Sequence, residues 1–234
     1  MLMRETGIYK INYSESLEEL INVTLELLKN KTKEYEKLFN IEIKEIRINY
    51  FDDIEKFRNF IYEIRKEKSL PEYATGTYDK GMINAYIEKE KQSKRVFTAS
   101  HELFHILYMK HILNDDYSKR IVWYDEGMAQ FMSGEKDRLK DENKFKEFYQ
   151  KVKENTKIIP NLNKLEHGKS FYNDNYNGYD LSYLSIKYLS EILDKKEFIN
   201  LMSDFNQIKE IGKNIVDNMF DYYNTKYKYK NGLL

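Results

Sequence analysis

Two histidines stand four residues apart in the segment His101-Glu102-Leu103-Phe104-His105. On an α-helix this spacing turns both imidazoles toward one side, one turn apart. We predict such a helix over residues 94–111. Apolar residues would line two of its sides, one with Val96, Ala99, Leu103 and Leu107 and the other with Phe97 and Tyr108 beside the histidines. A helix that is apolar on two sides is buried, so the fold must enclose it and give its histidines partners.

The same spacing lets two imidazole nitrogens reach one Zn²⁺ at ~2.0–2.1 Å. Glu102 lies about 100° around the helix from His101, a poor place for a third ligand but within reach of a water at the metal. His-Glu-x-x-His on a helix is typical of zinc metalloproteases, with the glutamate as general base. The pattern predicts His101 and His105 as metal ligands and Glu102 as the catalytic base.

Composition excludes several other classes of protein. The 234 residues carry 39 Lys+Arg and 39 Asp+Glu, so no net charge attracts nucleic acid or an anionic membrane. The absence of cysteine excludes disulfides and thiolate ligands, so a third metal ligand must be His, Asp or Glu. No apolar run reaches the ~18 residues of a membrane span. Without a signal-peptide pattern at the start we expect a cytoplasmic protein, or a secreted one if a leader was removed.

Hydrophobic periodicity predicts an α+β fold in two lobes. The N-terminal lobe, 1–112, has a short mixed sheet and ends with the His-Glu-x-x-His helix, whereas the C-terminal lobe, 113–234, is all helical. The predicted strands are 41–50, 73–78 and 82–88, and helices are predicted at 15–39, from 54 onward, 94–111, 122–134, 138–155, 176–194, 196–206 and 208–223.

A second segment, Trp123-Tyr124-Asp125-Glu126-Gly127-Met128-Ala129-Gln130, follows the first. Together the two segments resemble the gluzincin clan of zinc metallopeptidases, the thermolysin and aminopeptidase-N group, and most of all its peptidase MA-like family. The resemblance implies a zincin-like (thermolysin-like) catalytic domain, Zn²⁺, a peptide or protein substrate, and Glu126 as the third ligand. Asp125 is the alternative ligand. The small Gly127 and Ala129 would let this helix approach the His-Glu-x-x-His helix closely.

The resemblance extends to Tyr179-Asp180-Leu181-Ser182-Tyr183. In gluzincins a tyrosine of this region stabilises the oxyanion, and Tyr179 is the best match, with Tyr176 and Tyr183 as alternatives. A phenol can donate a hydrogen bond there without a change of charge. Where thermolysin-like enzymes often place an aspartate that holds the first histidine, this chain has Gln130, whose amide oxygen could accept the imidazole N–H.

Other features of the sequence bear on specificity. The Gly-Ala-Met-Glu-Asn motif of aminopeptidases has no counterpart, since Gly81-Met82-Ile83-Asn84-Ala85 lacks its glutamate, which favours an endopeptidase. Residues 82–88 would form either an edge strand that binds substrate or an ordinary sheet strand. His167 could serve as an auxiliary donor. The alternatives are a non-catalytic binding or regulatory module with this fold, and hydrolysis of a non-peptide substrate. The oligomeric state stays open.

Overall fold

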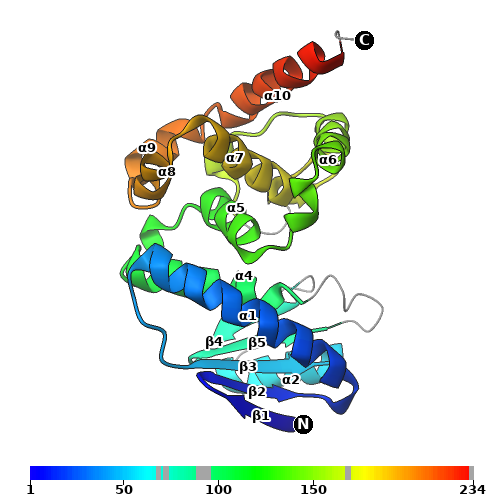
Figure 1. The fold of residues 1–234 in the computed structure, drawn as a ribbon, viewed down its shortest axis with the longest axis vertical. Helices are drawn as coiled ribbons and strands as arrows, with labels where there is room; N and C mark the ends of the chain where they lie inside the picture. Colours follow the sequence, from blue (N-terminus) through cyan, green and yellow to red (C-terminus); the bar gives the residue numbers. More distant parts are fainter. Residues whose placement is uncertain (67–69, 71–73, 88–95, 167–169, 232–234) are drawn as a thin grey trace. The chain divides into compact units, whose positions relative to one another are not determined.

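The structure is a computed structural model that describes residues 1–66, 70, 74–87, 96–166 and 170–231 (Figure 1). The fold is α+β, as predicted, with many helices and a small mixed sheet. The chain separates into unit 1, Met1–Leu107 with Met132–Glu135, and unit 2, Tyr108–Phe131 with Lys136–Leu234. Helices α4 (Thr98–His111) and α5 (Val122–Ser133) each contribute residues to both units.

Unit 1 contains a sheet that has five strands within the described ranges, in the order β1-β2-β3-β5-β4. The strands are β1 (Leu2–Thr6), β2 (Tyr9–Tyr13), β3 (Ile46–Phe51), β4 (Gly76–Asp79) and β5 (Met82–Tyr86). β2, β3 and β5 run parallel to one another, and the two outer strands pair antiparallel with their neighbours. The sheet is therefore mixed, with β1 and β4 at its edges.

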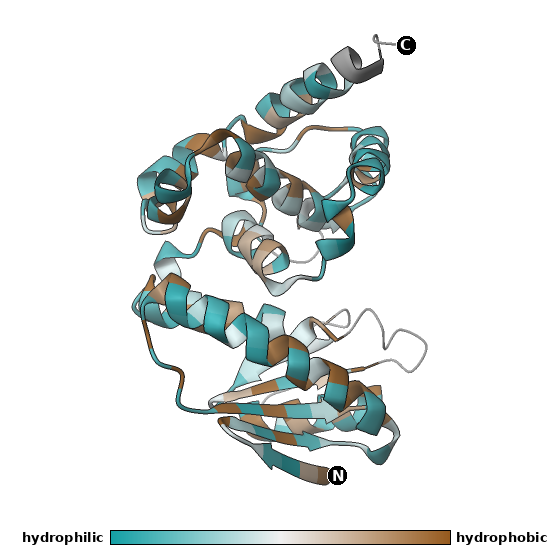
Figure 2. Ribbon diagram, in the orientation of Figure 1, coloured by the Kyte–Doolittle hydropathy of each residue, from teal (hydrophilic) through white to brown (hydrophobic). Residues whose placement is uncertain are grey.

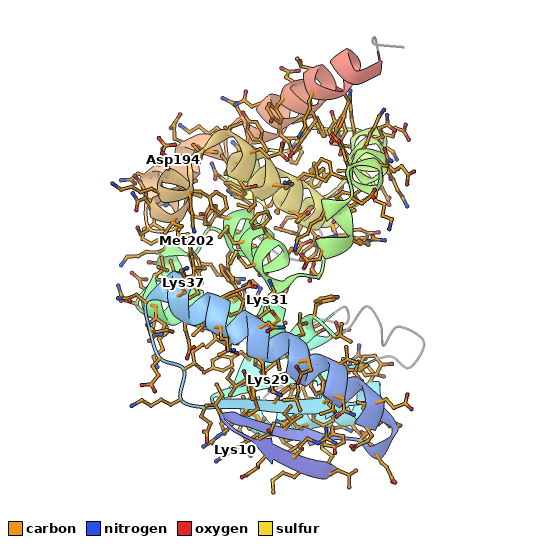
Figure 3. The ribbon with its side chains drawn as sticks, in the orientation of Figure 1. Lys10, Lys29, Lys31, Lys37, Asp194 and Met202 are labelled. Carbon is orange, nitrogen blue, oxygen red and sulfur yellow. The ribbon has the colours of Figure 1, made fainter. Side chains whose placement is uncertain are left out.

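Two helices cover the faces of this sheet. α1 (Glu18–Phe39) crosses one face (Figure 1), where the Tyr9 hydroxyl donates to Thr32 Oγ1 at 3.0 Å. α2 (Ile54–Arg65) packs Phe57 against Phe51 on the other, and Asp53 caps its first turn. Hydrophilic residues predominate on the rest of α1 (Figure 2), and its labelled Lys29 and Lys31 pair with glutamates one turn away (Figure 3). The helices thus bury their apolar sides against the strands.

A row of amides crosses three strands of the sheet. Asn12 Nδ2 donates to Asn49 Oδ1 at 2.8 Å, and Asn49 Nδ2 donates to Asn84 Oδ1 at 2.7 Å. The three residues lie in register on β2, β3 and β5, and the last two are buried. Because a shift of one residue would move an amide to the opposite face, this row fixes the strand register.

The structure contains a hairpin in unit 1 that was not predicted, and it decides between the two alternatives for residues 82–88. The hairpin of β1 and β2 was not predicted; it turns at Gly7, whose φ of 58° suits glycine at the first position of a two-residue turn. The strand predicted at 82–88 is β5, which is interior because β3 and β4 pair with its two sides. β4 is the edge strand instead, and residue 88 lies outside the described residues.

Unit 2 is mostly helical. Beyond α5 its helices are α6 (Glu142–Asn155), α7 (Gly178–Ile192), α8 (Lys195–Leu201), α9 (Phe205–Ile211) and α10 (Ile215–Asn231). The prediction of an all-helical C-terminal lobe is wrong, because β6 (Tyr172–Asn173) and β7 (Tyr176–Asn177) form a short hairpin. The predicted helices 196–206 and 208–223 are three helices instead, since Asp194 (labelled in Figure 3) and Asp204 cap new helix starts.

Close packing of α5 against α7 depends on Gly127. A Cβ atom at this position would lie 2.6 Å from the carbonyl oxygen of Ser182 and 2.7 Å from Ile186 Cγ1. The close approach that the sequence predicts at Gly127 is therefore an approach to α7, because the α7 backbone fills the space beside this glycine.

Within the described residues, no helix is both long enough and apolar enough to span a membrane.

Candidate metal centre

The His-Glu-x-x-His segment lies on α4, as predicted, although residues 94 and 95 of the predicted helix lie outside the described residues. The predicted apolar positions Ala99, Leu103 and Leu107 are buried, and the histidines are half-buried. α1 supports the first half of α4 through the edge-to-face contact of Tyr35 with Phe104. α4 is therefore fixed in unit 1 by core packing.

The two histidine rings converge on one point. His101 Nε2 and His105 Nε2 lie 3.0 Å apart, with the ring planes at 76° to each other. Two ligand atoms of a tetrahedral zinc ion with bonds of ~2.0–2.1 Å lie about 3.4 Å apart. The two nitrogens are slightly closer than that, so both can bind one metal ion after a small rotation of the rings.

The tautomer of His101 also suits metal binding. Its Nδ1 lies 3.1 Å from Glu135 Oε2. An ionised carboxylate only accepts hydrogen bonds, so the ring proton belongs on Nδ1. A neutral ring with its proton on Nδ1 leaves Nε2, the atom that faces His105, unprotonated, and an unprotonated imidazole nitrogen is what zinc binds.

Glu102 lies beside the backbone of edge strand β4. A methyl group placed on Gly76 would overlap Glu102 Oε1, and it would lie 3.3 Å from Thr98 Cγ2. The Glu102 carboxylate can occupy its present position because residue 76 is a glycine and has no side chain. Glu102 as a whole is half-buried.

Arg120, which lies just before α5, contacts two adjacent carboxylates on that helix. Its Nε donates to Asp125 Oδ2 at 2.5 Å, and its Nη2 donates to Glu126 Oε1 at 3.1 Å. The Asp125 side chain is fully buried, whereas 12% of the Glu126 side chain is exposed. Burial of Arg120 opposes its charge, but the two carboxylates outweigh it and raise the pKa of the guanidinium above its usual value.

The ligand atoms of His101, His105 and Glu126 all lie within 4.8 Å of one another. The set consists of two imidazole nitrogens and one carboxylate oxygen, which is the donor set of open zinc sites with three protein ligands. These residues fit a zinc ion. The structure therefore brings together the three residues predicted as ligands, whereas the alternative, Asp125, is not among the clustered residues and its side chain is fully buried.

Of the three candidate tyrosines, two are engaged elsewhere. The Tyr176 hydroxyl donates to the Ser170 carbonyl oxygen at 3.0 Å, and Tyr183 is buried with its ring against Phe148. Tyr179, in the first turn of α7, is half-buried with its ring 4.5 Å from that of Phe171. Tyr179 stays the candidate that the resemblance names, as a prediction.

Gln130 links the helix of Glu126 to Tyr179. Its Nε2 donates to the Tyr179 carbonyl oxygen at 2.9 Å and lies 3.4 Å from the Glu126 carbonyl oxygen. The sequence placed Gln130 as the partner of His101, but the carboxylate at hydrogen-bond distance from His101 Nδ1 is Glu135. Sequence reasoning missed Glu135, and its only signal is a carboxylate just after the helix, in Ser133-Gly134-Glu135.

Among the described residues, His111 is not part of this cluster. His111 is exposed at the end of α4. His167, predicted as an auxiliary donor, lies outside the described residues.

Comparison with known proteins adds no relative: no family model matches the chain, and the search of curated proteins finds no match.

Proposed function

We propose that this chain is a zinc-dependent metallopeptidase with a zincin-like fold. The observation that carries the proposal is the convergence of His101, His105 and Glu126, with Glu102 on the same helix as the two histidines. The bound zinc would supply Lewis acidity for the hydrolysis of a peptide bond. His101, His105 and Glu126 would hold it.

The chain's own residues would then move the protons. Glu102 takes a proton from the water that attacks the scissile carbonyl carbon, and passes it to the amine nitrogen when the C–N bond breaks. Tyr179 donates a hydrogen bond to the carbonyl oxygen as negative charge develops there. The complete reaction consumes one water molecule and forms one carboxyl group and one amino group.

Edge strand β4 supports an endopeptidase rather than an aminopeptidase. Its inner side pairs with β5, and its other side has no strand partner in the described part of the sheet. An extended peptide could add to that edge, passing Gly76 and the Glu102 carboxylate beside it. A peptide that is bound along its length can be cleaved at an internal bond, without its N-terminus in the site.

The proposal is tested by cleavage of a peptide library with zinc-loaded protein. We expect internal cleavage, loss of activity with a zinc chelator, and recovery when zinc is restored. Release of single N-terminal residues would indicate an aminopeptidase instead. An absence of cleavage, or cleavage that the chelator does not change, would contradict the metallopeptidase.

Gly76→Ala is expected to lower kcat/KM at least about tenfold with little change in stability. The new methyl group would displace the Glu102 carboxylate, and a misplaced catalytic group costs up to ~10²-fold. The displaced atom is the end of a flexible side chain, so folding should tolerate the change. Peptide cleavage, a thermal melt and zinc content should be measured on one sample. Unchanged kcat/KM would show that Glu102 does not act from its present position.

Tyr179→Phe is expected to lower kcat by about a hundredfold, because one donor to the developing oxyanion is lost. Tyr176→Phe and Tyr183→Phe are the matched controls, and both should cleave peptides at close to the wild-type rate. If a control is impaired while Tyr179→Phe is not, the donor is a different tyrosine of this region.

A further inference from the structure

Glu135 stands at a position that the sequence motifs do not mark. Its Oε2 lies 3.1 Å from His101 Nδ1, and both residues belong to unit 1. The two side chains are only 17% and 27% exposed, for His101 and Glu135 respectively. A contact that is this well shielded from water is screened less than a surface ion pair.

The backbone turn after α5 brings Glu135 back toward α4. Gly134 has a φ of 89°, a conformation that favours glycine, and it directs the chain back at the end of the helix. The Glu135 N–H then donates to Ser133 Oγ at 3.3 Å.

A buried network ties this turn to the residue that precedes His101. Ser100 Oγ donates to the Ser133 carbonyl oxygen at 3.2 Å, and the Tyr35 hydroxyl donates to the Ser100 carbonyl oxygen at 3.1 Å. Ser100, Ser133 and Tyr35 are fully buried. Because buried hydrogen bonds of this kind are costly to break, the network fixes the turn, and with it Glu135, relative to His101.

We propose that Glu135 is the positioning residue for His101, an inference that rests on the proposed metal centre. Glu135 accepts the Nδ1–H of His101 and so holds the ring with an unprotonated Nε2 toward His105. Glu135 is not one of the clustered ligand residues, so it acts through His101. Its charge makes Nε2 a stronger ligand, as carboxylates that bind metal-ligating histidines do.

The direct test is the tautomer of His101 in the metal-free protein. The chain has four histidines, so their ring nitrogens can be assigned by ¹⁵N NMR. We expect the proton of neutral His101 on Nδ1 in the wild type and its redistribution toward Nε2 in Glu135→Ala. Glu135→Gln should keep the Nδ1–H tautomer in part, since an amide oxygen also accepts. An identical tautomer in all three proteins would overturn the inference.

The second test is zinc affinity by competition with a chromogenic chelator. We expect Glu135→Ala to bind zinc about 10- to 100-fold more weakly and Glu135→Gln to lie between it and wild type. Glu63→Ala, an exposed glutamate of α2 in the same unit, is the control and should bind like wild type. Circular dichroism checks that each variant folds, and the isosteric Glu135→Gln carries the test if Glu135→Ala does not.

The outcomes separate this inference from the proposed function. If wild type and Glu135→Ala bind zinc equally well, Glu135 does not position His101, whereas the metal centre stands. If wild type binds no zinc, the metal centre fails, and the role of Glu135 at a metal ligand fails with it.

Discussion

Glu102→Gln is expected to abolish peptide cleavage while zinc content and fold stay at wild-type levels. Glutamine keeps the size of the side chain, so it fits beside Gly76, but it cannot take a proton from the attacking water. General bases contribute ~10²–10⁴-fold, and we expect a loss near the upper end because no other carboxylate shares this helix. The measurement is kcat/KM on a cleaved peptide, with zinc determined on the same sample.

Glu63→Gln is the matched control for this substitution, because Glu63 is an exposed glutamate on α2 of the same unit. It should leave kcat/KM unchanged. Cleavage by Glu102→Gln at the wild-type rate would refute the peptidase mechanism. Loss of zinc from Glu102→Gln would instead show that Glu102 contributes to metal binding.

Glu126→Gln and Asp125→Asn are expected to have opposite effects, although the residues are neighbours. Glu126→Gln should fold and lose stoichiometric zinc, since a neutral amide is a poor replacement for the carboxylate ligand. Asp125→Asn should keep zinc but lower the free energy of unfolding by about 3 kcal/mol, because it breaks the ion pair between Arg120 and the fully buried Asp125 carboxylate.

Zinc content and urea unfolding of the two variants measure these effects together. Arg120 pairs with both carboxylates, and its shorter contact is with Asp125. Glu126→Gln keeps that contact, so its free energy of unfolding should be close to that of wild type. Zinc loss from Asp125→Asn, with zinc retained in Glu126→Gln, would move the third ligand to Asp125.

The residues closest to the proposed chemistry were predictable because their pattern is local. The positions of His101, Glu102 and His105 follow from helix geometry, and the structure places both histidine Nε2 atoms 3.0 Å apart. Glu126 and Tyr179 were predicted by resemblance. The structure clusters Glu126, and not the buried Asp125, with the two histidines, whereas the choice of Tyr179 stays a prediction.

The contacts that the sequence did not predict depend on distant parts of the chain. Glu135 is 34 residues after His101 in the sequence, and a turn at Gly134 brings the two side chains together. A contact over this sequence separation cannot be predicted from residue spacing on a helix or strand. The Asn12–Asn49–Asn84 row requires a strand order that alternating hydrophobicity does not specify. In the hairpin of β1 and β2, β1 is exposed or half-buried and has no alternating apolar pattern, whereas the alternation in the five residues of β2 was missed.

The most direct test of the account is a crystal structure of the zinc-loaded protein with anomalous data collected at the zinc absorption edge. The account predicts one strong peak, ~2.0–2.2 Å from His101 Nε2, His105 Nε2 and a carboxylate oxygen of Glu126, with Glu102 beyond bonding distance. A peak bonded to other side chains, or no peak in protein that is saturated with zinc, would contradict the metal centre and the function proposed from it.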